Sequence, residues 1–266
     1  MGRIADAFAK ANEEGRAALV IYLCAGDPSL DWTPELIAAI AEAGADVVEL
    51  GMPFSDPTAD GEAIQLASQR ALKAGTTLKG ALEAMKATRA KTDVPVLLFG
   101  YYNPLLVYGE EAIARDAKAA GVDGFLVVDL PPEEAAPLEA PIREAGLDYV
   151  PLVAPTSTPE RKKAAGAVAS GFVYYVSMTG VTGAKATTLD VAAESAAALG
   201  GELERPVAVG FGIRTPEDAA TVAAKADGVV VGSAVVRRIA AAGSLEEAKA
   251  SVAELVRGLA AACRRP

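Results

Sequence analysis

Eight short runs of apolar residues recur along the chain, separated by longer segments in which apolar and polar residues follow a helical period. The runs are ALVIYL from Ala18, DVVEL from Asp46, VPVLLF from Val94, GFLVVDL from Gly124, YVPLVA from Tyr149, GFVYYVS from Gly171, PVAVGFG from Pro206 and GVVVGS from Gly228. Near-continuous runs of Val, Leu and Ile are typical of strands buried on both faces of a parallel sheet. The pattern therefore predicts buried parallel strands that alternate with helices.

Several of the intervening segments open with a helix-start signal. The tripeptide Thr-Pro-Glu begins at Thr33, Thr158 and Thr215, and PPEE begins at Pro131. A Thr hydroxyl at the N-cap accepts a hydrogen bond from a free backbone N–H, and Pro at the next position lacks the N–H that would be unpaired there. We expect helices to begin at these positions.

Eight strand–helix units in 266 residues suit a (β/α)8 barrel, for which about 250 residues are typical. We expect one TIM-barrel domain over residues 1–266, with a helix at the N-terminus and extra helices after the second strand and near the eighth. An open doubly wound sheet is the alternative. Its phosphate fingerprint, G-x-G-x-x-G, is missing after the first strand, where the chain reads CAGDPSL, so the barrel is favoured.

Charge and apolar content limit the location of the protein and its partners. The chain has 25 Lys and Arg residues against 35 Asp and Glu residues, a formal net charge of -10 that repels nucleic acid and anionic lipid. The N-terminal stretch lacks an apolar signal core, and the two cysteines, Cys24 and Cys263, lie at opposite ends of the chain. The most apolar window is shorter than the roughly 20 residues of a membrane helix. We expect a cytoplasmic protein that binds neither nucleic acid nor membranes.

The chain contains no histidine, which excludes Ser-His and Cys-His nucleophile pairs and any His-based metal site. No predicted strand ends on a lysine, so a Schiff-base aldolase mechanism has no obvious nucleophile. We expect no metal and assign acid–base work to carboxylates supported by tyrosines.

Two carboxylates stand where barrel enzymes place their chemistry, at the C-terminal ends of the strands. Glu49 ends the second run, and strand alternation puts it on the same face as Val47. If that face is the barrel interior, burial raises the pKa of Glu49 toward a range useful for proton transfer; otherwise the carboxylate leaves the strand for solvent or caps a helix. Asp60 follows in the next loop, where Asp before Gly is also common turn chemistry.

Glycines after the last strands form a second candidate site. GFG at 210–212 and GS at 232–233 follow the seventh and eighth strands, where barrels often bind phosphate through backbone N–H groups, although tight turns explain glycine equally well. Gly183 would make the loop after the sixth strand flexible enough to act as a lid over a ligand, or it belongs to an ordinary surface loop. Tyr22 and Tyr174 either line an aromatic pocket or fill the barrel core.

Six motifs, AGDP, ELGMPFSDPTADG, YYNP, YYVSMTGVTG, GFGI and GSAVV, together closely resemble the α subunit of tryptophan synthase. The resemblance covers nearly the whole chain. It implies a (β/α)8 barrel that cleaves indole-3-glycerol phosphate to indole and glyceraldehyde 3-phosphate. It also implies an α2β2 complex in which the β subunit, not this chain, carries pyridoxal phosphate and receives indole through a tunnel.

Matched by motif, the resemblance implies that Glu49 is the catalytic glutamate and Asp60 the catalytic aspartate. It implies substrate-binding roles for Tyr174, Tyr22, Gly183, Gly212, Gly232 and Ser233. In the family's retro-aldol reaction Glu49 would protonate carbon 3 of the indole ring, and it is a candidate base for the side-chain hydroxyl. Asp60 would hold the indole N–H and stabilise the positive charge that develops on the ring nitrogen.

Three residues depart from the family's usual motifs, namely Thr58, Glu62 and Met178. All lie in or beside the mobile loops of the family, so they bear on the strength of coupling to a β subunit. Pro53, Asp56 and Asn103 fall in segments that face or signal to the β subunit in the family.

Three other functions remain open from the residues alone. The chain could be a stand-alone indole-glycerol-phosphate lyase that needs no partner, or an isomerase of a phosphorylated sugar on the same type of barrel. It could also be a regulatory binding subunit without catalysis, against which the intact Glu49 and Asp60 argue.

Overall fold

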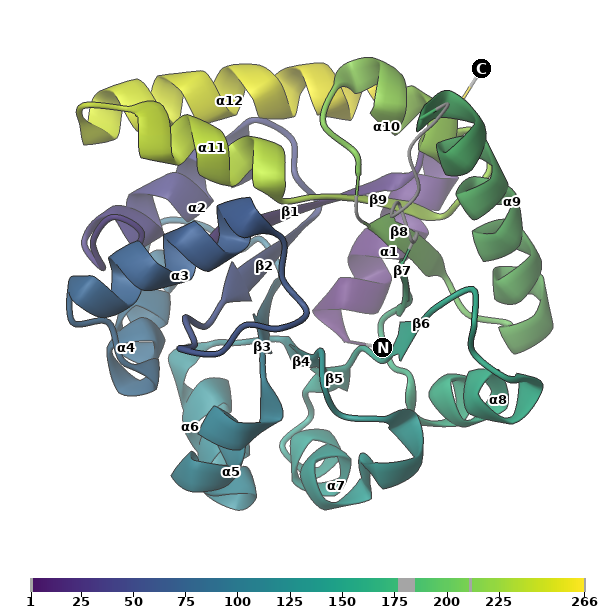
Figure 1. Ribbon diagram of the computed structural model, residues 1–266, viewed down its shortest axis with the longest axis horizontal. Helices are drawn as coiled ribbons and strands as arrows, with labels where there is room; N and C mark the ends of the chain where they lie inside the picture. Colours follow the sequence, from purple (N-terminus) through teal and green to yellow (C-terminus); the bar gives the residue numbers. More distant parts are fainter. Residues whose placement is uncertain (1, 177–184, 211, 266) are drawn as a thin grey trace.

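The computed structural model describes residues 2–176, 185–210 and 212–265. The strands form one parallel sheet in the order β5-β4-β3-β2-β1-β9-β8-β7-β6, and helices surround it (Figure 1). The strands are β1 (Ala18–Cys24), β2 (Val47–Gly51), β3 (Val96–Gly100), β4 (Gly124–Val127), β5 (Asp148–Tyr149), β6 (Leu152–Val153), β7 (Val173–Val176), β8 (Val207–Gly210) and β9 (Gly228–Val231). The (β/α)8 TIM barrel expected from the sequence is confirmed.

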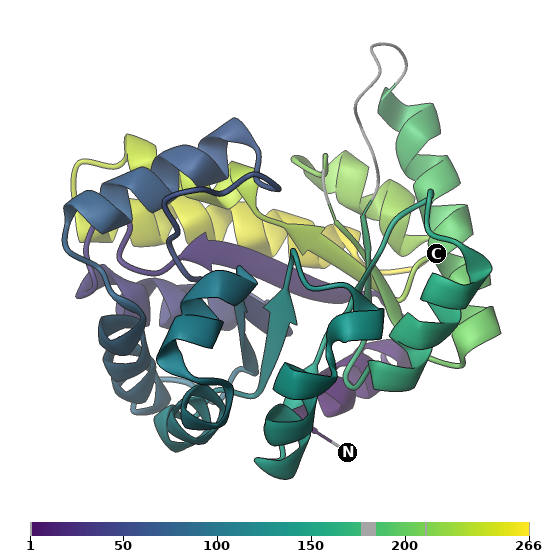
Figure 2. The same ribbon diagram turned by 60° about the horizontal axis from the view of Figure 1, so that its bottom comes forward.

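The helices alternate with these strands and cover the outside of the sheet (Figure 2). They are α1 (Arg3–Glu13), α2 (Trp32–Glu42), α3 (Glu62–Lys73), α4 (Leu78–Arg89), α5 (Tyr102–Tyr108), α6 (Glu110–Ala120), the 3-10 helix η1 (Pro132–Glu134), α7 (Ala136–Glu144), α8 (Pro159–Val168), α9 (Lys185–Leu203), α10 (Pro216–Ala223), α11 (Ser233–Ala241) and α12 (Leu245–Ala262). The expected N-terminal helix is α1, the extra helix after the second strand is one of the pair α3 and α4, and the extra helix near the eighth strand is one of the pair α11 and α12. Within the described ranges, none of these helices is both long and apolar enough to cross a bilayer.

The fifth apolar run forms two short strands instead of one, because Pro151 has no N–H to give to a neighbouring strand. The sheet nevertheless continues through this point. The N–H of Val150 donates to the carbonyl of Phe125 at 2.8 Å, and the carbonyl of Pro151 accepts from the N–H of Tyr174 at 3.0 Å. Since β5 and β6 stand at the two ends of the strand order, this segment closes the barrel.

The helix-start signals hold at Thr158 and Thr215, whose hydroxyls accept backbone hydrogen bonds as N-caps of α8 and α10. The expectation at Thr33 is wrong. Helix α2 begins at Trp32, and the Thr33 hydroxyl accepts the N–H of Gly26 at 3.0 Å, so it holds the β1–α2 turn. Pro34 is tolerated in the first turn, where backbone N–H groups have no intrahelical acceptor.

Side chains alternate along the strands between the barrel interior and the surrounding helices. On β1, Tyr22 and Cys24 belong to the interior cluster, whereas Ile21 and Leu23 pack in the shell beneath the helices. Helix α1 contributes Phe8 to the interior, where its ring stacks on Phe172 with centroids 4.8 Å apart. One end of the barrel is thus filled with apolar side chains.

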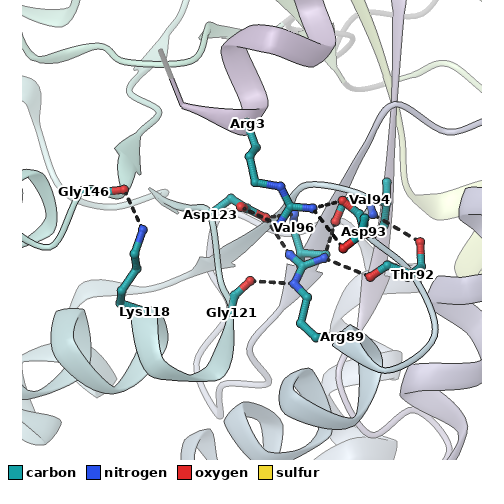
Figure 3. A network of polar contacts seen from close by, with 10 residues as sticks. All are labelled: Arg3, Arg89, Thr92, Asp93, Val94, Val96, Lys118, Gly121, Asp123 and Gly146. Atoms are coloured by element: carbon teal, nitrogen blue, oxygen red, sulfur yellow. Dashed lines mark hydrogen bonds and ion pairs between the residues drawn. The ribbon is translucent and has the colours of Figure 1, made fainter.

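A polar network ties α1 and α4 to the starts of β3 and β4 (Figure 3). Asp123, which precedes β4, accepts hydrogen bonds from Arg89 at 2.6 Å, from Arg3 at 3.2 Å and from the N–H of Val96 at 2.8 Å. Arg89 also donates to the carbonyl of Gly121 at 2.8 Å. Because this network lies at the N-terminal ends of the strands, its charges serve the scaffold and leave the opposite end for chemistry.

Candidate active site

Glu49 lies inside the barrel, as its alternation with Val47 predicts. It is paired in register with Tyr22 on β1 and Leu97 on β3, and Val47 and Leu97 belong to the interior cluster. The residue is 1% exposed, and its Oε1 has no hydrogen-bond partner in the described part of the chain. Burial alone raises the pKa of Glu49 to about 8. At neutral pH this side chain therefore holds a proton that it can transfer.

Asp60 lies in the loop between β2 and α3 and is held by Tyr101 at the end of β3. The Tyr101 hydroxyl donates to Asp60 Oδ2 at 3.1 Å and accepts the N–H of Ala59 at 3.0 Å. The Phe54 ring packs on Tyr101 with centroids 5.1 Å apart. Burial raises the pKa of Asp60 to about 6, and the hydrogen bond from Tyr101 opposes that rise. Asp60 is thus ionised above about pH 6, where Glu49 is still protonated.

Both carboxyl groups line one cavity of about 100 Å³. Five of the six expected substrate-binding residues line the same cavity, namely Tyr22, Tyr174, Gly212, Gly232 and Ser233. The sixth, Gly183, lies outside the described residues, as does Met178. Residues far apart in the sequence are therefore brought to one site at the C-terminal ends of the strands.

The cavity has further lining residues that the sequence analysis did not single out, which are Gly61, Ile64, Phe99, Ile213, Arg214 and Val230. Phe99 and Val230 could have been found, because alternation along β3 and β9 places them inside the barrel. Ile64 lies four residues after Asp60 in the first turn of α3. Arg214 carried no sequence signal beyond its place after the GFG motif.

Tyr22 and Tyr174 form aromatic walls of the cavity, and glycines make room for them. A side chain at Gly51 would overlap the Tyr22 hydroxyl, and one at Gly210 would overlap that of Tyr174. Burial raises the pKa of both tyrosines well above the ordinary value, so they remain neutral phenols. The strand-end glycines thus shape the pocket.

The glycines after β8 and β9 form the end of the cavity suited to an anion. Gly212 has a φ of 86°, a left-handed conformation that favours glycine. Gly232 is the N-cap of α11, which begins at Ser233. The first N–H groups of a helix have no intrahelical acceptors and attract phosphate.

No cluster of three or more acidic or cysteine side chains in the described ranges could hold a metal ion. Within those ranges the cavity offers carboxyl groups, phenols, the Ser233 hydroxyl, the Arg214 guanidinium and backbone N–H groups as its chemistry.

Tyr101→Phe tests the hydrogen bond to Asp60. Because the Tyr101 hydroxyl stabilises the ionised carboxylate, its loss should raise the pKa of Asp60 further, by about one unit. Activity should then fall mainly at low pH, with a loss of about fivefold at pH 6 and a smaller loss at pH 8. Parallel pH–rate profiles of the variant and the wild type measure this; an equal loss at both pH values would show that the hydroxyl does not tune Asp60.

Comparisons with known proteins agree with this geometry. The model of the family described as tryptophan synthase alpha chain matches residues 8–264. The tryptophan synthase alpha chain of Geobacter sulfurreducens is 54% identical over 237 residues, which are 89% of this chain and 90% of that relative. That of Citrifermentans bemidjiense is 53% identical over 237 residues, covering 89% of both chains.

Solved structures give the same result. Tryptophan synthase subunit alpha from Legionella pneumophila has a TM-score of 0.91 at 37% identity, covering 99% of this chain and 98% of that one. A chain of Mycobacterium tuberculosis tryptophan synthase has a TM-score of 0.87 at 38% identity, covering 100% of this chain and 99% of that one. The protein described here therefore belongs to the tryptophan synthase alpha chain family.

Proposed function

We propose that Glu49 and Asp60 carry out the α reaction of tryptophan synthase by acid–base catalysis in the barrel cavity. The family establishes that the chain is an enzyme, a lyase that converts indole-3-glycerol phosphate to indole and glyceraldehyde 3-phosphate in tryptophan biosynthesis. The observation that supports the two catalytic assignments is a protonated carboxyl and an ionised carboxylate lining one cavity, with pKa values of about 8 and about 6.

Glu49 would act first as an acid and then as a base. Its carboxyl proton passes to carbon 3 of the indole ring, which leaves a positive charge on the ring system centred at nitrogen. The Glu49 carboxylate then takes the proton from the hydroxyl on the attached side-chain carbon. That oxygen forms the aldehyde carbonyl as the carbon–carbon bond breaks, and the bonding electrons return to the ring. Indole is released, and Glu49 again carries its proton.

Asp60 would hold the indole N–H and face the positive charge while it exists. Its ionised form stabilises that charge best inside a cavity that excludes water, since low dielectric strengthens the attraction. Tyr101 keeps the carboxylate in place through the 3.1 Å hydrogen bond. Asp60 is thus an electrostatic group and Glu49 the proton carrier.

The remaining cavity residues would bind the two ends of the substrate. Tyr22 and Tyr174 offer apolar walls to the indole ring and glycerol chain. Gly232 and Ser233, at the start of α11, would bind the phosphate through backbone N–H groups, together with Gly212 in the loop between β8 and α10. A phosphate-binding role for Gly183 rests on the motif resemblance alone.

A tryptophan synthase β subunit is the proposed partner, in an α2β2 complex. On α5, Leu106 is 51% exposed and Val107 is 80% exposed, close in sequence to Asn103. Tyr101, which holds Asp60, is the N-cap of the same helix. A partner seated on α5 could therefore bias the position of Asp60. Pyridoxal phosphate would belong to that partner and not to this chain.

The proposal extends to location and domain organisation. We propose that the protein works in the cytoplasm, as a biosynthetic enzyme would, and that residues 1–266 act as one domain.

Indole release from indole-3-glycerol phosphate by the purified chain, alone and with a β subunit and serine, tests the partner assignment. We expect slow release that rises at least about tenfold with the partner, because the partner would order the loop around Asp60. Equal, fast release in both conditions would instead identify a lyase that needs no partner.

A further inference from the structure

Binding a phosphate in this cavity requires positive charge that backbone N–H groups alone do not supply. Three ionisable groups other than tyrosines line it, which are Glu49, Asp60 and Arg214, and Arg214 is the one cation among the described lining residues. At pH 7.5 Glu49 is mostly protonated and Asp60 is ionised, so without Arg214 the cavity would carry a net negative charge. The substrate phosphate brings about -1.5 to -2 charges at neutral pH. The whole chain, at -10, adds to the repulsion.

Arg214 is placed at the phosphate end of the cavity. It follows Gly212 by two residues in the loop between β8 and α10, and Gly232 and Ser233 at the start of α11 line the same cavity. The backbone of this loop is fixed, because Asp218 Oδ2 accepts the N–H of Arg214 at 2.9 Å and belongs to the capping box of α10. The backbone of Arg214 is therefore held at a defined position beside these glycines.

The guanidinium of Arg214 is not committed to another group. Within residues 2–176, 185–210 and 212–265 it makes neither an ion pair nor a side-chain hydrogen bond, and the residue is exposed. Asp218 is engaged instead with backbone N–H groups of Arg214 and Thr215. An exposed guanidinium with free donors matches phosphate in charge and geometry.

We propose that Arg214 binds the substrate phosphate from the solvent side and completes the site formed by Gly212, Gly232 and Ser233. This inference rests on the proposed function, because the proposed function assigns the substrate phosphate to the end of the cavity formed by these three residues. Arg214 then selects for a phosphorylated substrate and takes no part in proton transfer. Its contribution is to affinity, so it should appear in KM and not in kcat.

Arg214→Gln removes the cation, and Arg237→Gln is the matched control. Arg237 is an exposed residue of α11, makes no ion pair or hydrogen bond in the described part of the chain, and does not line the cavity. We expect Arg214→Gln to raise KM about tenfold, equivalent to about 1.4 kcal/mol, with kcat within about twofold of wild type. Arg214→Lys should recover part of the affinity, and the rise of KM with salt should become shallower in Arg214→Gln alone.

Binding of glycerol 3-phosphate, a non-reacting probe, separates this inference from the catalytic proposal. Calorimetry should show about tenfold weaker binding to Arg214→Gln and unchanged binding to Arg237→Gln. Gly212→Asp, which puts a negative charge beside the phosphate, should weaken binding in any case. If Gly212→Asp weakens binding while the two arginine variants behave alike, the phosphate site stands and the role of Arg214 is overturned. Weaker binding to Arg214→Gln supports it even if turnover is absent.

Discussion

Glu49→Gln should lower kcat for indole release by about 10³-fold and leave the dissociation constant of the substrate within about threefold of wild type. Glutamine has nearly the same size as glutamic acid but has no proton to give to carbon 3 of the ring. At 1% exposure and with a pKa of about 8, Glu49 is already uncharged at neutral pH, so the neutral amide replaces it without a change of charge.

The stability of the variant provides the control. Because burial raises the pKa of Glu49 in the folded state, the wild type loses stability as pH rises from about 4.5 toward 8, and Gln does not titrate. Glu49→Gln should therefore be at least as stable as wild type at pH 8, which thermal unfolding measures. Turnover at the wild-type rate in this folded variant would remove Glu49 from the mechanism.

Asp60→Asn should lower kcat about 10²-fold, the second largest loss. Asparagine still offers a carbonyl oxygen to the Tyr101 hydroxyl, so the loop should keep its position while its negative charge is lost. The positive charge on the ring nitrogen is then left without its counterion in the cavity. Steady-state kinetics should show the loss mainly in kcat. An unimpaired variant would reduce Asp60 to a turn residue in the loop before α3.

Sequence patterns predicted the parts of the structure that depend on local periodicity. The alternation of Val47 and Glu49 placed the catalytic candidate inside the barrel, and runs of Val and Leu marked the strands. Helix starts at Thr158 and Thr215 followed from their side-chain chemistry. The error at Thr33 arose because its hydroxyl satisfies the N–H of Gly26 across the loop, a contact that tripeptide chemistry does not encode.

The site depends on contacts between distant segments, which is why part of it was not predictable. Tyr101 and Asp60 are separated by 41 positions, and their hydrogen bond exists only once β3 and the β2–α3 loop are side by side. Among the described residues, the Arg214 guanidinium is likewise free because the Asp218 carboxylate accepts backbone N–H groups instead of pairing with it. The pKa values that distinguish Glu49 from Asp60 are products of burial, a property of the folded barrel.

The alkaline side of the pH–kcat profile for indole release tests the central claim most directly. If a protonated Glu49 donates the proton to carbon 3, kcat should fall tenfold per pH unit above about 8, as Glu49 loses that proton. Below that limit kcat should be nearly flat down to about pH 7. A rate that stays constant or rises through pH 8 to 10 would contradict proton donation by Glu49.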